Sequence, residues 1–343
     1  MTIVRLDVLN IFLMLFALGL ALVFPFETFL LAYAFIGPLH YLTEISWLHD
    51  RKNFCARKLD AIFLIVPVVF IVFGSTLLPR SLQLPIFQEI TPEILFFAFL
   101  MAIVCHFTKV PWKRILGFLG VLAGTALFSF SGMWRYWITL FLPTVIHVFI
   151  FTGVFILLGA LRNRSWTGIA SLSVFVLSAA LCFASPFGGL GASPGAWARQ
   201  SFGLYAPIAS GLAQFLGLHP GKAAGPLAPF ANVEEMYSAR AVLKVMTFFS
   251  FAYLYHYLNW FSKTHVIGWH RITKARAGAI LGIWLGSVAL YLWNFQAGFL
   301  WLYLLSLGHV TLEFPLNWLS MKETASRMGS MLRIPGMVRV PGS

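Results

Sequence analysis

The sequence predicts an all-α fold, a polytopic membrane helix bundle of about ten transmembrane helices with both termini in the cytoplasm. Three observations lead to this prediction. Of the 343 residues, 59% are hydrophobic and only 10% are charged, against roughly a quarter charged in an ordinary soluble domain. Ten apolar segments approach the length of about 20 residues that a helix needs to cross a bilayer. Lys and Arg concentrate in alternate loops between these segments.

The ten segments follow one another along the chain. The first is expected to be a retained helix, because Phe24-Pro25-Phe26-Glu27 follows it in place of a small-residue cleavage site. The fourth has a clear start, since Thr91 can cap it, Pro92 suits a first turn, and Glu93 favours the positive end of the helix dipole. The predicted spans are 8–24, 28–50, 61–78, 91–108, 115–131, 136–161, 168–185, 240–261, 277–295 and 297–321.

The basic residues predict the orientation of these spans. With ten crossings, 18 of the 24 Lys and Arg residues fall on one side, and the positive-inside rule places that side in the cytoplasm. The net charge of +13 is then explained by loop topology, so we expect membrane lipids and no nucleic acid as partners. The eighteen are Arg5, Arg51, Lys52, Arg57, Lys58, Lys109, Lys113, Arg114, Arg162, Arg164, Lys263, Arg271, Lys274, Arg276, Lys322, Arg327, Arg333 and Arg339.

The chain is expected to form one membrane domain over residues 1–321, followed by a basic cytoplasmic tail over 322–343. One long excursion, over 187–239, is rich in Gly, Ala and Pro and falls on the outer side. Within it, 201–218 is apolar but interrupted by Pro207. We expect an interfacial or re-entrant lid there, because another crossing would reverse every later basic loop.

Ionisable residues are unevenly distributed among the predicted spans. Six of the nine His lie in even-numbered spans and none in odd-numbered ones, and only two acids lie well inside a span. Each acid follows a His by four residues, which places both side chains on one helical face. We estimate the depth of each residue in the bilayer by counting back to the nearest cytoplasmic basic residue at 1.5 Å per residue. The depths of these two pairs and of His256 agree within about 10 Å. The pairs are His40 with Glu44 and His309 with Glu313.

This pattern predicts a metal centre between helices. Neutral imidazole and carboxylate bind iron, zinc, copper or manganese, and a cation would offset the cost of buried carboxylates. The alternative is that each His makes an interhelical hydrogen bond, which we favour for His106 and His147 taken singly. The candidate ligands are His40, Glu44, His256, His309 and Glu313, with His106 and His147 as lesser candidates.

The span layout and His positions resemble integral-membrane histidine-rich non-haem iron enzymes, namely membrane desaturases and hydroxylases and the carotenoid-cleaving Brp/Blh group. The chain carries HxxxE twice in place of the HxxxH or HxxHH boxes. The resemblance implies a bacterial inner-membrane oxygenase or hydroxylase with non-haem iron, a lipid-soluble substrate such as a carotenoid, sterol or acyl chain, and an electron-donor protein. Two alternatives stay open: a haem b electron carrier with His147 and His309 as axial ligands, and a proton-coupled transporter using Glu44 and Glu313.

Overall fold

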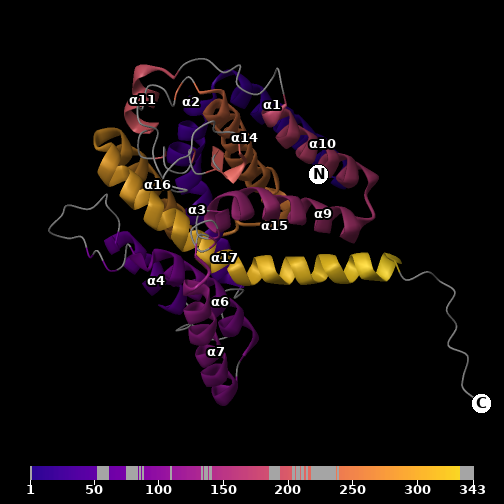
Figure 1. Ribbon diagram of the computed structural model, residues 1–343. Helices are drawn as coiled ribbons and strands as arrows, with labels where there is room; N and C mark the ends of the chain where they lie inside the picture. Colours follow the sequence, from indigo (N-terminus) through magenta and orange to yellow (C-terminus); the bar gives the residue numbers. More distant parts are fainter. Residues whose placement is uncertain are drawn as a thin grey trace, which may run out of the picture.

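The computed structural model is helical throughout its regular structure (Figure 1). It describes residues 2–51, 62–74, 84, 86, 89–108, 110–132, 134, 138, 141–184, 194–202, 205, 209, 212–213, 215–217, 237 and 239–332. The helices are α1 (Ile3–Val23), α2 (Pro25–Leu31), η1 (Ala32–Ile36), α3 (Gly37–Arg51), α4 (Ile62–Gly74), α6 (Thr91–Phe107), α7 (Pro111–Ser129), η4 (Leu142–Phe151), α9 (Thr152–Asn163), α10 (Trp166–Phe183), α11 (Ala196–Phe202), α14 (Arg240–Ser262), α15 (Thr264–Ile267), α16 (Lys274–Trp293) and α17 (Phe295–Leu332).

Helices lie in all ten predicted segments, but some helices begin or end at other residues than the predicted spans do. The second segment is built of α2, η1 and α3 in succession, and the sixth of η4 and α9. Helix α17 continues past the predicted end at Met321 to Leu332. The continuation is polar and begins with good helix formers, and Glu323 bonds Arg327 one turn on. Such i,i+4 pairs support a helix without an apolar core.

Five helices among the described residues are long and apolar enough to cross a bilayer. Their outward faces expose large apolar side chains, such as Phe12 on α1 and Leu285 on α16. Extended apolar surface of this kind is unfavourable in water and suits contact with lipid. The structure therefore supports a helical membrane protein. The five are Ile3–Val23, Leu142–Asn163, Trp166–Phe183, Lys274–Trp293 and Phe295–Ser330, and Thr91–Cys105 is a shorter apolar helix.

Buried apolar side chains form two clusters, one on either side of α17. The larger joins α1, α2, η1, α10 and α14, and the smaller joins α4 and α6 to α17 and the end of α3. Figure 1 shows the long α17 passing between α14 above and α4 and α6 below. Because α17 also packs against α3, α9 and η4, the middle of this helix is where the two clusters meet.

Two of the helices at this junction contain π-helical turns. In η1 the amide of Gly37 bonds the carbonyl of Ala32, five residues back. Pro38 follows at once and has no amide hydrogen, so the regular i→i−4 pattern cannot continue through it. The carbonyl of Phe35 accepts a hydrogen bond from Trp284 Nε1 of α16 at 2.7 Å. Packing thus stabilises an irregular turn directly before the helix that carries His40.

The described part of the expected outer lid packs into the larger cluster. The amide of Gly195, just before α11, bonds Glu27 of α2 at 2.7 Å. Tyr205 is buried, with its ring 5.0 Å from Phe29 and 4.7 Å from Phe299. These contacts attach the segment to the end of the bundle where α2 begins. Most of residues 203–236, including His219, lies outside the described part of the chain.

Candidate metal centre

Four helices each contribute one buried His to the junction. His40 comes from α3, His147 from η4, His256 from α14 and His309 from α17, with exposed fractions of 1%, 1%, 8% and 2%. Their rings lie next to one another: the ring centroids of His40 and His256 are 4.8 Å apart, and those of His147 and His309 are 5.0 Å apart. Four imidazoles from four helices thus share one water-poor site.

The imidazole nitrogens approach one another closely. Nε2 of His40 lies 3.2 Å from Nε2 of His256, and Nε2 of His147 lies 3.1 Å from Nε2 of His309. Ring nitrogens of His40, His256 and His309 all fall within 4.8 Å of one another. Two nitrogens bound to one ion at about 2.1 Å lie about 3.0 Å apart at a right angle and about 3.4 Å apart at the tetrahedral angle. The spacings of the two close pairs, His40 with His256 and His147 with His309, fall between these values.

Both carboxylates of the HxxxE pairs face the same site. Glu44 Oε2 lies 3.1 Å from Nε2 of His40, one turn away on α3. Glu313 Oε2 lies 3.2 Å from Nδ1 of His147, which belongs to a different helix. Glu44 and Glu313 are 2% and 3% exposed. The site therefore offers nitrogen and oxygen donors in the combination that suits iron, zinc or manganese.

The hydrogen bonds of Thr152 determine which ring nitrogen of His256 carries the proton. The Thr152 hydroxyl donates its one proton to the carbonyl of Val148 at 2.7 Å, so it can only accept from His256 Nδ1 at 2.8 Å. Neutral His256 then carries its proton on Nδ1 and a free lone pair on Nε2. A partner on the outer nitrogen fixes metal-binding His residues in the same way. His256 is thus oriented as a ligand, with Nε2 directed at His40.

Several polar atoms in the site lack a hydrogen bond among the described residues. Nδ1 of His147 and Oε2 of Glu313 are close, but their angle does not make a hydrogen bond, and both atoms are buried without a partner. Nδ1 of His40 is also buried and unpaired. Burying unpaired polar groups is costly. A cation between the imidazoles and carboxylates would satisfy the donor atoms that face the site.

Aromatic side chains enclose this group of residues. The Tyr41 ring stacks on His309 at a centroid distance of 4.3 Å, and its hydroxyl lies 2.7 Å from that of Tyr257. Trp260 packs edge-on against His40 at 5.5 Å and donates from Nε1 to Thr43 at 3.0 Å. Gly37 leaves room for the Tyr41 hydroxyl, which would lie 2.8 Å from a Cβ there. The imidazole planes are thus held by packing.

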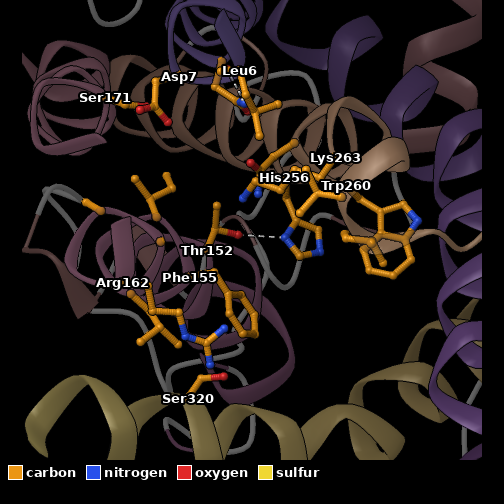
Figure 2. Close-up of a pocket in the computed structure, with 18 of the residues that line it drawn as sticks. Leu6, Asp7, Thr152, Phe155, Arg162, Ser171, His256, Trp260, Lys263 and Ser320 are labelled. Carbon is orange, nitrogen blue, oxygen red and sulfur yellow. Dashed lines mark hydrogen bonds between the residues drawn. The ribbon is translucent and has the colours of Figure 1, made fainter. Parts of the chain in front are cut away.

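A cavity of 530 Å³ leads from these residues to the end of the bundle where α1 begins and α9 and α14 end. Its inner end includes His40, Glu44, His256 and Glu313. Figure 2 shows His256 bonded to Thr152 beside the open space, with Arg162 farther along α9. Ligand sites of 300–1,000 Å³ are typical of small-molecule binding proteins.

The structure brings together all five main candidate ligands from the sequence and His147, one of the two lesser candidates. The side chain of His106 lies outside the described part of the chain. His265 is exposed in α15 and is not among the residues that line the cavity. Whether the assembled residues bind a metal stays a prediction.

Three neighbours of the site were not among the sequence candidates: Thr152, Tyr41 and Trp260. Thr and aromatic residues are common in apolar helices, so their type carried no signal. Only the spacing of Tyr41 next to His40, and of Trp260 one turn after His256, could have drawn attention to them.

Comparison of the chain with protein-family models, curated proteins and solved structures finds no match.

Proposed function

We propose that this protein is a membrane-embedded metal-dependent oxygenase or hydroxylase that acts on a lipid-soluble substrate. The observation that carries the proposal is the convergence of four His and two Glu side chains in one buried site, with nitrogen–nitrogen distances of 3.1 Å and 3.2 Å. The proposed ligands are His40, Glu44, His147, His256, His309 and Glu313.

The donor set favours non-haem iron as the metal. Imidazole and carboxylate ligands with open positions are typical of ferrous oxygenases. When bound, such an iron supplies the redox chemistry needed to activate dioxygen. An electron-donor protein on the cytoplasmic side would then be the partner, while a carotenoid, sterol or acyl chain would be the substrate.

The protein's own residues have three tasks in this proposal. Thr152 holds the tautomer of His256, and Tyr41 and Trp260 fix the ring planes of His309 and His40. The surrounding aromatic shell excludes bulk water, which strengthens electrostatic interactions within the site. The cavity holds an apolar substrate against the ligand group.

The geometry favours this proposal over a haem b carrier. Axial nitrogens of a haem lie on opposite faces of the porphyrin and are separated by two metal–nitrogen bonds of about 2 Å each. The 3.1 Å between Nε2 of His147 and Nε2 of His309 is too short for that arrangement. The proton-coupled transporter, with Glu44 and Glu313 as the relay, is the second candidate, because both carboxylates are buried inside the helix bundle.

The proposal includes the full topology expected from the basic residues: ten crossings, both termini in the cytoplasm, and location in a bacterial inner membrane. Helices lie in each of the ten predicted segments, and five helices of the described part are long and apolar enough to cross a bilayer, which supports the multi-span part of the proposal. On this topology the open end of the cavity faces the cytoplasm, since Arg162 and Lys263 line it.

Metal analysis of protein purified in a neutral detergent tests the proposal. The parent should hold at least one equivalent of iron, and His40→Ala or His256→Ala should lose most of it. His265→Ala is the matched control, because His265 is exposed in α15 and should leave the iron content unchanged. A well-folded parent with less than about a tenth of an equivalent of any transition metal would contradict the proposal of a metalloenzyme. The proton-coupled transporter would then be the better-supported function.

A further inference from the structure

The cavity is a route between the candidate ligands and a polar mouth. Its walls are mostly apolar, with Leu6, Phe155 and Ile156 facing the space between the two ends. Asp7, Arg162 and Lys263 line it toward the mouth. A ligand that fills this cavity would therefore have a long apolar body, with a polar head at the mouth.

Two of the three charged side chains toward the mouth are already paired. Arg162 donates from Nε to Glu323 at 2.9 Å and from Nη2 to the other carboxylate oxygen. Asp7 accepts from the hydroxyls of Ser165 and Thr167 at 2.8 Å and 2.6 Å. Arg162 therefore already has a carboxylate partner, and one carboxylate oxygen of Asp7 is held by two hydroxyls.

Lys263 differs from these two. Its ammonium makes no hydrogen bond or ion pair with the side chains that the structure describes, and Asp7 acts on it only through a longer-range attraction. The side chain is half-buried, and burial lowers the pKa of the ammonium to about 8. An anion next to it would stabilise its charged form. Figure 2 shows Lys263 on the same helix as His256 and Trp260, beside the cavity.

We propose that the substrate is an amphiphile with a carboxylate head group, such as a long-chain fatty acid, and that Lys263 binds this head group. The inference rests on the proposed function and names the class of its substrate. Lys263 lies seven residues beyond His256, which separates head group and metal centre by about 10 Å along the helix. A carbon in the apolar chain, not the head group, is then presented to the metal.

The local charges favour a monoanion. A single ammonium is a compact point charge, whereas phosphate is held best by several donors or by a bidentate Arg. Arg162 is engaged by Glu323, and Asp7 would repel a dianion more strongly than a monoanion. A carboxylate therefore fits this mouth better than a phosphate.

Equilibrium binding of radiolabelled palmitate to the full-length protein in a neutral maltoside detergent tests the inference. Lys263→Gln should weaken binding at least about tenfold, because it removes the charged partner of the carboxylate. Lys263→Arg should retain it and shows that the fold tolerates substitution there. Lys274→Gln, at an exposed position on α16 outside the cavity lining, should bind as the parent does.

Palmityl alcohol, which has the same chain without the charge, separates head-group recognition from chain burial. It should bind the parent more weakly than palmitate and should not distinguish the parent from Lys263→Gln. Equal binding of palmitate by Lys263→Gln and parent, or equal binding of acid and alcohol by the parent, would overturn the inference. The test is independent of the metal, since His309→Ala, at a candidate ligand that does not line the cavity, should lose iron yet keep palmitate. A failed metal centre and a failed head-group site are thus told apart.

Discussion

Single side chains orient the imidazoles of the candidate centre. Thr152 is the clearest case, because its hydroxyl gives its proton to Val148 and so leaves His256 Nδ1 as the donor. Tyr41 and Trp260 act on His309 and His40 by ring packing alone. Partners of this kind typically change metal affinity by 10–100-fold.

Replacing Thr152 by Val tests the orienting hydrogen bond. The isosteric side chain keeps the packing but leaves His256 Nδ1 without its acceptor, so iron affinity should fall about tenfold or more. Competition with a chelator measures the change. Thr247→Val is the matched control, since Thr247 is also buried and bonds only the Leu243 carbonyl of its own helix. Equal chelator sensitivity of the two variants would show that the bond does not position a ligand.

His147 is the residue on which sequence and structure differ most. Taken singly it suited an interhelical hydrogen bond, but its ring lies between His309 and Glu313. We expect His147→Ala to deplete iron as strongly as His309→Ala, in the same metal analysis. If His147→Ala keeps the full iron content while His309→Ala loses it, His147 is not a ligand.

At the scale of elements, the hairpin of α16 and α17 presents His309 and Glu313. Asn294 links the two helices, and its side chain caps α17 by accepting from the amide of Ala297 at 3.0 Å. Gly298 lies in the first turn, where an added Cβ would come within 2.3 Å of the backbone of Tyr291. The close approach of the two helices thus depends on this glycine.

Gly298→Ala should therefore strain the hairpin. The contact is with backbone and cannot be relieved by a rotamer change, so we expect a loss of about 2–3 kcal/mol and a fall in Tm of roughly 3–4 °C. Thermal unfolding in detergent provides the measurement. Gly286→Ala, on α16 with nothing near the added Cβ, should leave Tm unchanged or slightly raised. Similar Tm values for both variants would contradict the close approach.

At the scale of the whole molecule, the candidate centre lies where the two apolar clusters meet across α17. Helices α3 and η4 pack against this helix, α14 approaches it through His256, and α4 and α6 support it from the other side. The ligands thus come from chain segments more than 250 residues apart, from His40 to Glu313. Assembly of the site therefore requires the complete bundle.

The orientation of the bundle is testable with single cysteines in a background lacking the three native ones at 55, 105 and 182. Gln200→Cys, in the outer segment, should react with an impermeant reagent in intact cells. Ser326→Cys, on the exposed end of α17, should react only after permeabilisation. The opposite pattern would reverse the sidedness that the basic loops predict.

The sequence by itself determined the helical segments and one local pair of candidate ligands, His40 with Glu44. Apolar runs define membrane helices because each backbone polar group in lipid must be paired within its own segment. The i,i+4 spacing placed Glu44 beside His40, and the two lie 3.1 Å apart, because this relation depends only on helix geometry.

Only the tertiary structure decided which helices meet and how each side chain is turned. Glu313 contacts His147 of η4, and His147 lies on a π-helical segment whose register differs from that of an α-helix. Thr152 and Lys263 likewise acquire their roles from neighbours on other helices. Such contacts follow from long-range packing between helices, which local periodicity does not encode.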